Sequence, residues 1–580
     1  MIPKDCKRLA EVDFPIAVVS KHSAREKSIR HGHPSTIHLW WARRPLAACR
    51  AMLLGLLLPD PADENCPDDF KHEARKLLPT LVGTIGPKDL DLRAALLKFI
   101  GDFANWDVAS HPEYISVGRG LVKAAHPDET PLVVDPFAGG GAIPLEALRL
   151  GCDAFASDLN PVACLILKVM LEDIPRHGPE LADELRRVGK EIKEKAEKEL
   201  AEFYPKDPDG STPIAYLWAR TVRCEAPNCG AEIPLIRSFC LCKKSNRRRA
   251  LRYKIVRPRG HVPRVEISIF APESEKEVSG GTVTRAKATC LCCGTALPPE
   301  RVRAQLAEQH GGANTIFDKK GNRTGGALLT AVVTISPSEA GRHYRLPVDR
   351  DYHAVWKAQK LLRSILDEWD RGGKNGLCPV PNEPLPPIGT LGFRVQRYGI
   401  TDWGKFFSDR QEISMFVFGK LIGKQKKIGR PLSLALGKLA DLSNVVCPWE
   451  SNAECPRNVL SNGRVKPSWD FAEGVLTSDS SGSFEVCIDN LVAGIRSIGS
   501  IANTATVQQA AAQSSPLSDD SASIWFTDPP YYDAIPYAAL SDMFFVWFKR
   551  CINDGSPFRD PWNPTNQLTP KELEIRFFWK

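Results

Sequence analysis

The residues with the clearest chemical potential are Asp528-Pro529-Pro530-Tyr531, which follow the apolar run at residues 523–527. The Asp528 carboxylate and the backbone carbonyl of Pro529 are two neighbouring hydrogen-bond acceptors, and the prolines hold this backbone rigid. Tyr531 adds a flat aromatic face beside them. Such a group can hold a planar ring that carries an amino group, because the acceptors draw the amine hydrogens and free its lone pair while the ring stacks on Tyr531.

A second run of interest is Val133-Val134-Asp135-Pro136-Phe137-Ala138-Gly139-Gly140-Gly141, followed by a helix-like stretch at 142–151. It predicts a strand, a glycine turn and a helix whose free N–H groups face a ligand. A further strand, 152–157, ends at Asp158, a place where an acidic residue commonly holds ribose hydroxyls. The candidate cofactor-binding residues here are Asp135, Pro136, Phe137, Gly139, Gly141, Asp158 and Asn160. The G-x-G-x-x-G fingerprint of dinucleotide-binding folds is absent.

Together the two runs resemble the motifs of methyltransferases that modify exocyclic amino groups of bases. The resemblance implies a doubly wound, Rossmann-like α/β core in which the glycine run binds S-adenosylmethionine. It assigns catalysis to Asp528, Pro529, Pro530 and Tyr531.

Four cysteines have the spacing of two zinc knuckles, Cys224 with Cys229 and Cys290 with Cys293. Each pair lies in a turn followed by glycine, and two pairs complete a four-thiolate site with no open position. A structural zinc ribbon is therefore expected. Cys292 fits the spacing less well, Cys240 and Cys242 are alternative ligands, and buried free thiols are the other interpretation of such cysteines.

Residues 243–259 carry nine basic residues and no acidic one, whereas the whole chain has a net charge of +8. Basicity is thus local, which favours contacts to phosphates of double-stranded DNA. A solvated charged face is the alternative. The candidate DNA-binding residues are Arg247, Arg248, Arg249, Arg252 and Lys254.

The stretch Ser35-Thr36-Ile37-His38-Leu39-Trp40-Trp41-Ala42-Arg43-Arg44-Pro45-Leu46 extends the resemblance to one family. With the features above it is similar to prokaryotic adenine-specific DNA methylases that contain a zinc ribbon and an N-terminal domain of unknown function. Further shared features are Trp403, Phe406-Phe407, Arg410-Gln411, residues 469–473 and residues 528–537. The resemblance implies methylation of adenine in DNA, restriction or phage-defence partners, and cofactor-pocket roles for His38, Trp41 and Arg43. Core tryptophans and helix-capping arginines are the alternative interpretation.

Other chemistries remain open at this point. Methylation of a cytosine ring carbon needs a cysteine nucleophile, generally in a Pro-Cys dipeptide, and the chain has none. Methylation of the cytosine amino group, an RNA base or protein glutamine uses similar acceptors. A non-catalytic zinc-ribbon protein that binds DNA is the alternative from another class.

The expected organisation has four parts: residues 1–99, helical and contributing to the cofactor pocket; 100–175, the cofactor-binding half; 176–344, an insert with a charged helix at about 179–202 and the zinc ribbon; and 345–580, the catalytic half. At 580 residues and 43% hydrophobic the chain can build several domains. Its seventeen cysteines and the lack of a signal peptide indicate the cytoplasm. The apolar run 51–59 is too short to span a membrane and fits a buried helix.

Two expectations concern the end of the chain. The stretch 504–523, rich in serine, alanine and glutamine, predicts a mobile loop before the catalytic strand. The sequence also departs from the family after about residue 573, as though truncated. A helix at about 540–550 would then leave Phe544, Phe545 and Trp547 poorly covered, with weak activity and a tendency to aggregate.

Overall fold

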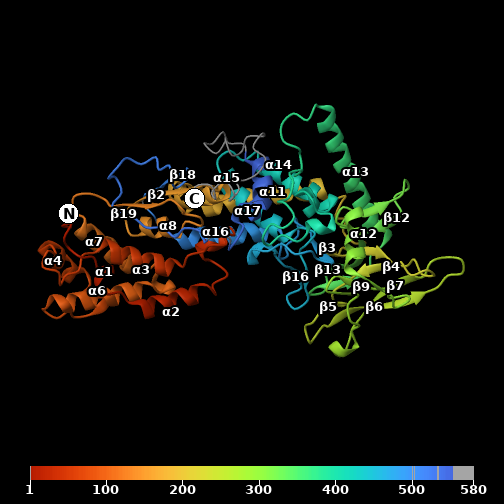
Figure 1. Ribbon diagram of the computed structural model, residues 1–580, viewed down its shortest axis with the longest axis horizontal. Coiled ribbons are helices and arrows are strands. Elements are labelled where there is room, and N and C mark those ends of the chain that lie inside the picture. Colours follow the sequence, from red (N-terminus) through yellow and green to blue (C-terminus); the bar gives the residue numbers. More distant parts are fainter. Residues whose placement is uncertain (1, 500, 502, 532–533, 553–580) are drawn as a thin grey trace. The chain divides into compact units, whose positions relative to one another are not determined.

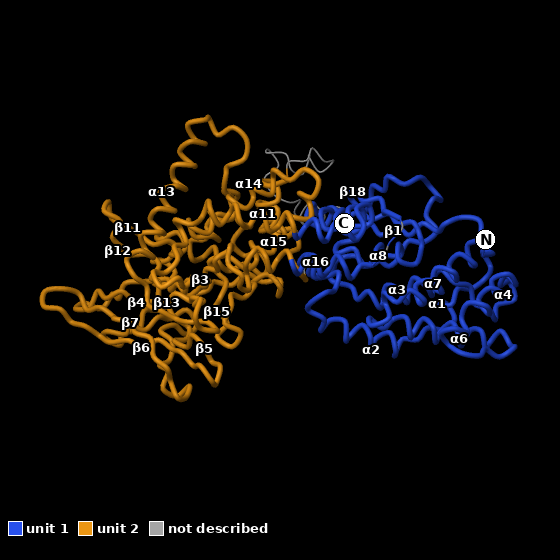
Figure 2. The backbone as a smooth tube through the Cα atoms, turned by 180° about the vertical axis from the view of Figure 1, so that it is seen from behind, with its two compact units in different colours: residues 1–186, 489–532 blue, residues 187–488, 533–580 orange. Residues whose placement is uncertain are grey.

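The computed structural model describes residues 2–499, 501, 503–531 and 534–552. The chain folds into two compact units, of residues 1–186 with 489–532 and of residues 187–488 with 533–580, coloured separately in Figure 2. The expected segments 1–99 and 100–175 both lie in unit 1. Residues 345–488, most of the expected catalytic half, belong to unit 2 together with the insert. The run 528–531, which the sequence analysis expects to be catalytic, belongs to unit 1.

Unit 1 contains a four-stranded parallel sheet in the order β18-β2-β1-β19. The strands are β1 (Leu132–Asp135), β2 (Asp153–Asp158), β18 (Thr506–Gln509) and β19 (Ile524–Trp525). The first two are short apolar runs buried on both faces, as is typical of parallel sheets. Strands from near residue 150 (orange) and from beyond residue 500 (blue) lie together in Figure 1. The mixed α/β class expected from the sequence is confirmed.

Helices flank this sheet. α8 (Ala142–Arg149) packs against β1 and β2, α9 (Pro161–Lys168) packs against β2 and β18, and α3 (Leu46–Leu57) packs on α8. The other α-helices that lie wholly in unit 1 are α1 (Leu9–Val12), α2 (Ile16–Glu26), α4 (Asp68–Leu77), α5 (Pro79–Val82), α6 (Asp89–Phe103), α7 (Pro112–Ala125) and α10 (Ile174–His177). The apolar run 51–59 is thus the end of a buried helix, as expected.

The expectation of an unstructured loop at 504–523 is wrong for residues 506–509, which form β18. Backbone N–H groups anchor this strand to unit 1: Ala505 donates to the Leu171 carbonyl at 3.1 Å and Val507 to Glu172 Oε1 at 3.1 Å. An edge strand of polar residues such as Gln508 and Gln509 lacks the apolar alternation by which strands are recognised in a sequence.

Unit 2 is built around β3 (Thr212–Arg223), the long central strand of an antiparallel sheet. Its partners are β4 (Glu232–Leu235), β13 (Leu328–Ile335), β17 (Asp470–Gly474) and, beyond β13, β14 (His343–Arg345). Smaller sheets contain β5 (Cys240–Cys242), β6 (Arg249–Val256), β7 (Arg264–Phe270), β8 (Val283–Thr284), β9 (Lys287–Thr289), β10 (Ala296–Leu297), β11 (Thr315–Phe317), β12 (Arg323–Gly326), β15 (Trp449–Glu450) and β16 (Cys455–Pro456).

The helices of unit 2 are α12 (Pro299–Glu308), α13 (Asp349–Arg371), α14 (Asp409–Ile422), α15 (Gly429–Leu442) and α17 (Tyr537–Cys551). α11 (Glu180–Leu200), the expected charged helix, and α16 (Phe484–Ile498) each continue from one unit into the other. Within the described ranges, no helix is both long and apolar enough to cross a lipid bilayer.

The expected poor coverage of α17 is wrong. Phe544 and Phe545 are fully buried and Trp547 is 1% exposed, because α17 packs against α14 and α15. The Trp547 ring also meets Phe407 edge-on, with centroids 5.3 Å apart.

Two runs used for the family resemblance meet in the core of unit 2. Arg410 donates two hydrogen bonds to Glu473, of 2.7 and 2.8 Å, and both side chains are 1% exposed. The guanidinium lies 4.0 Å from the Tyr216 ring centroid, and Trp218 Nε1 donates to the same carboxylate at 2.8 Å. A buried pair satisfied in this way organises the core.

Candidate functional site

The carboxyl ends of β1 and β19 form the point where the strand order reverses. From β1 the chain builds outward through β2 to β18, and then returns to place β19 on the other side of β1. In open α/β sheets, ligands bind beyond the carboxyl ends of the strands at such a point. Asp135 ends β1, and Thr527 follows β19; the Thr527 hydroxyl donates to Asp135 Oδ1 at 2.6 Å. The two runs that the sequence singled out therefore meet.

The glycine run has the tight geometry that its composition predicts. Phe137 N donates to Asp135 Oδ1 at 3.1 Å, and Gly139 N donates to Asp158 Oδ2 at 3.0 Å. Gly141, with φ of 75°, caps the N-terminus of α8. This left-handed φ favours glycine, and a Cβ atom here would also displace the Met170 side chain, whose Cε would lie 2.2 Å away.

At the end of β2, Asp158 and Asn160 form a turn. Asn160 N donates to Asp158 Oδ1 at 2.8 Å, and Asn160 Oδ1 accepts from Val162 N at 2.9 Å, which caps α9. Asn160 therefore shapes the turn and caps α9. Asp158 is half-buried, and its carboxylate oxygens retain lone pairs that can accept a hydrogen bond from a ligand hydroxyl.

A cavity of about 60 Å³ lies between the glycine run and the N-terminal segment. His38 and Arg43 line it, as expected from the sequence; Trp40 lines it where Trp41 was expected. The wall also includes Arg44, Asp135, Phe137, Gly139, Gly140 and Asp528.

Trp40 closes this cavity over the glycines. A Cβ atom on Gly139 would lie 2.4 Å from Trp40 Nε1, and one on Gly140 would lie 3.4 Å from Trp40 Cδ1. The Trp40 ring therefore occupies the space through which a ligand would approach the backbone of these glycines. A ligand of nucleoside size fits against the glycines only when the Trp40 ring moves.

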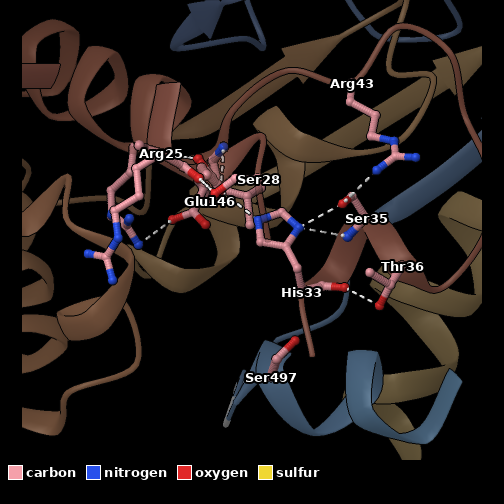
Figure 3. A network of polar contacts seen from close by, with 12 residues as sticks. Arg25, Ser28, His33, Ser35, Thr36, Arg43, Glu146 and Ser497 are labelled. Carbon is pink, nitrogen blue, oxygen red and sulfur yellow. Dashed lines mark hydrogen bonds and ion pairs between the residues drawn. The ribbon is translucent and has the colours of Figure 1, made fainter. Parts of the chain in front are cut away.

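A buried carboxylate fixes the segment that carries these residues. Glu26 Oε1 accepts from His33 Nε2 at 2.6 Å, and the Glu26 oxygens accept from the backbone N–H groups of Leu46 and Ala47 at 3.1 Å. Glu26 therefore caps α3. The other ring nitrogen, His33 Nδ1, contacts Ser35 Oγ at 2.7 Å and accepts from Ser35 N at 3.1 Å (Figure 3).

Arg43 joins the same network, since its Nη1 donates to Ser35 Oγ at 3.4 Å (Figure 3). Burial lowers the pKa of Arg43 from its ordinary value. It lines the cavity, so it can contact an anionic group of a ligand.

Arg44 and Asp528 line the cavity, and Tyr531 lies beside Arg44. Arg44 Nε forms an ion pair with Asp528 Oδ2, and its guanidinium carbon lies 5.6 Å from the Tyr531 ring centroid. Tyr531 is 67% exposed, and Pro529 and Pro530 are also exposed. Arg44 was not among the residues predicted to act here, although it lies inside a run that the sequence singled out.

Burial raises the pKa of Asp135 to about 7, against hydrogen bonds from Thr527 and Phe137 that lower it. The charges of Asp158 and Asp528 raise it further. Burial also raises the pKa of Asp158 to about 6. Carboxyl groups with pKa values raised by burial are common at functional sites.

The four predicted cysteines of unit 2 converge. Cys224 Sγ lies 3.6 Å from Cys293 Sγ and Cys229 Sγ 3.7 Å from Cys290 Sγ, with all four sulfurs within 4.8 Å of one another. Tetrahedral zinc with bonds of about 2.3 Å holds its sulfurs about 3.8 Å apart. The cluster can thus hold a metal such as zinc. Cys292 is not a member, nor are the alternative ligands Cys240 and Cys242.

The basic residues of the stretch 243–259 have different surroundings in the structure. Arg247 forms an ion pair with Glu454, a carboxylate that is 1% exposed, and Arg248 donates to the Glu273 carbonyl at 2.7 Å. These two arginines stabilise unit 2, and are less available to phosphates than the sequence predicted.

Arg249, Arg252 and Lys254 are exposed on β6, the central strand of the sheet β5-β6-β7. β6 pairs with β5 at Arg249 and Ala250, and residues 251–256 with β7 form a two-stranded ribbon beyond that point. In this register Lys254 lies opposite Glu266 and Arg252 opposite Ser268. The other face packs on the core around the cysteines through Ile255 and Val265. The available charge therefore lies on the outer face of the ribbon.

Comparison with known proteins gives one match. Residues 13–78 match a family model described as "Protein of unknown function (DUF1156)". This range holds α2, α3 and the segment between them that lines the cavity. No curated protein and no solved structure matches the chain.

Asp135→Asn tests the buried carboxylate, because asparagine keeps an oxygen for Thr527 and Phe137 but does not ionise. The ordinary pKa is 3.8 and the folded one about 7. Between these values the folded protein holds a proton that the unfolded chain has released, so the wild type loses stability relative to the variant as the pH rises. Above pH ~7 this loss of stability, counted from acid pH below 3.8, is complete and is on the order of 4 kcal/mol. Thermal melts of both proteins from pH ~5 to ~8 measure it; parallel curves would contradict the assignment.

Zinc content tests the cysteine cluster. We expect about one zinc per chain by elemental analysis, and loss of most of it in Cys229→Ser. Cys292→Ser is the matched control, since Cys292 lies between two cluster members yet outside the cluster. Equal zinc in the two variants, or folded protein without zinc, would identify these side chains as ordinary thiols.

Proposed function

We propose that this protein is an S-adenosylmethionine-dependent methyltransferase that modifies the exocyclic amino group of adenine in DNA. One observation carries the proposal: the glycine run after β1 and the Asp528-Pro529-Pro530-Tyr531 run after β19 lie at the carboxyl ends of adjacent parallel strands. A cofactor at the first and an amine at the second would be neighbours. A restriction or phage-defence setting accords with such a modification.

The strand order supports a Rossmann-like methyltransferase core. β1 and β2 end in the glycine run and in Asp158, while β19 ends in the acceptor pair, so one sheet edge gathers cofactor and substrate groups. Their convergence across a long stretch of intervening chain supports a shared role, because neighbouring strands need not both end in ligand-binding residues.

The residues present fit the proposed cofactor. Asp158 would hold its ribose hydroxyls, and Gly139 and Gly140 offer the close backbone approach. Arg43 and His38 would face its carboxylate end, and the carboxylates of Asp135 and Asp528 suit a cationic sulfonium. The cofactor supplies an electrophilic methyl group. Its binding would require the movement of Trp40 described above.

Asp528 and Pro529 would perform the amine chemistry. An aromatic amine is a poor nucleophile because its lone pair is delocalised into the ring. The Asp528 carboxylate and the Pro529 carbonyl would each accept an N–H bond, which turns the nitrogen toward a tetrahedral geometry and frees the lone pair. Tyr531, whose ring is exposed, would stack on the flipped base.

The metal-binding cluster and the ribbon β6–β7 would form the DNA-contacting part. Arg257 Nη2 donates to the Cys292 carbonyl at 2.6 Å, which ties the ribbon to the cysteine turn. A two-stranded ribbon fits the major groove of duplex DNA, and cations on its outer face would contact phosphates. A structural zinc would hold the base of this ribbon.

Asp528→Ala should reduce methylation roughly a thousandfold or more, because it removes a positioned acceptor, and should leave S-adenosylhomocysteine binding intact. The assay is methyl transfer to duplex DNA, with modified bases identified by mass spectrometry. Asp519→Ala, at an exposed aspartate of the same unit, is the control and should retain activity. Undiminished transfer by Asp528→Ala excludes the proposed chemistry, and a product other than N6-methyladenine redirects it to cytosine or RNA.

Arg252→Ala/Lys254→Ala should weaken binding to all duplex sequences alike and flatten the salt dependence by roughly two units of slope. Lys319→Ala/Lys320→Ala, an equal loss of charge at another exposed turn of unit 2, should leave the slope unchanged. Binding would be measured by fluorescence anisotropy over a range of salt concentrations. An identical slope in both double variants would place the DNA elsewhere.

A further inference from the structure

We infer that Arg44 occupies the binding place of the substrate's amino group and must leave before a base can enter. This inference rests on the proposed function, since it assigns the space between Asp528 and Tyr531 to an amine-bearing ring. It adds a residue that controls access to that space.

The contacts of Arg44 match those that the target base would make. A guanidinium is planar, delocalised and rich in N–H donors. Arg44 Nε donates to the Asp528 carboxylate, as an exocyclic amine would, and its guanidinium carbon lies over the Tyr531 ring, 5.6 Å from the centroid, on the face that a base would use for stacking. One side chain therefore satisfies both the acceptor and the aromatic face.

The backbone position of Arg44 is set by the start of α3. Arg44 precedes Pro45, the N-cap of α3, and the start of that helix is fixed by the bonds from Leu46 and Ala47 to Glu26. The Arg44 and Asp528 side chains are 30% and 37% exposed, so the pair is reachable from solvent. A substrate can compete for Asp528 while α3 stays in place.

The effect of Arg44 on the dissociation constant of a base can be calculated from its two contacts. A partly exposed ion pair and a cation–π contact are both weak interactions, and their combined loss is worth about fivefold in an equilibrium constant. When only a fraction of molecules has an open site, the apparent dissociation constant is raised by the inverse of that fraction. Removing Arg44 should therefore tighten base binding roughly fivefold.

The decisive ligand is adenosine, which has the amine and the flat ring but no phosphate for a free arginine to contact. Its dissociation constant would be measured by ligand-observed NMR for the wild type, Arg44→Ala and Arg44→Lys with S-adenosylhomocysteine at saturation, because adenosine would otherwise also fill the proposed cofactor site. We expect about fivefold tighter binding for Arg44→Ala and a smaller gain for Arg44→Lys, which keeps the charge without the planar fork. Arg25→Ala, which breaks an exposed pair with Asp107 in the same unit, is the control and should bind like the wild type.

Steady-state methylation of duplex DNA provides the second readout. Arg44→Ala should lower KM for DNA with kcat changed less than about twofold, because only access is altered. Equal or weaker adenosine binding by Arg44→Ala overturns the inference, and so does a fall in kcat at unchanged KM. S-adenosylhomocysteine binding separates the two proposals. A wild type that neither binds it nor methylates nucleic acid refutes the proposed function, while the adenosine series still decides the role of Arg44.

Discussion

The hydrogen bond from the Thr527 hydroxyl to the Asp135 carboxylate, 2.6 Å long, joins the ends of two strands that are far apart in the chain. It depends on the parallel pairing of β1 with β19, and the rest of the site follows from that pairing. Because the two strands are parallel and in register, the glycine run after β1 and the proline run after β19 both lie at the same edge of the sheet. Asp135 is nearly inaccessible to water, so the bonds from Thr527 and Phe137 offset part of the penalty of burying a carboxyl group there.

The buried carboxylate of Glu26 has a comparable role for the N-terminal segment that lines the cavity. Glu26 replaces the missing backbone partners at the start of α3 and also accepts from His33. Because both its oxygens are used, the segment between α2 and α3 has little freedom to shift. Trp40, Arg43 and Arg44 therefore approach the sheet from fixed backbone positions, and any opening of the cavity must come chiefly from side-chain rotation.

The sequence predicted those features of the molecule that depend on residues close together in the chain. The strand-glycine-helix order around Asp135 and the paired cysteines are short-range signals, and the structure has them as expected. The partner of a charge is a different matter: Arg247 meets Glu454, which lies 207 positions away, and Arg44 meets Asp528 across most of the chain. No window of sequence contains both members of such a pair. β18 was missed because a polar edge strand needs no apolar face. The coverage of α17 was missed because its neighbours α14 and α15 end more than ninety residues earlier in the chain.

The interleaving of the two units has a consequence for synthesis on the ribosome. After β2 emerges, the chain makes residues 187–488 of unit 2 before β18 and β19 exist, which takes roughly 15–60 s at typical elongation rates. During that interval β1 and β2 are a two-stranded fragment with both edges open, a form that pairs readily with other chains. The nascent protein would then depend on α3, α8 and α9 to shield the fragment, or on a chaperone, until the last strands arrive.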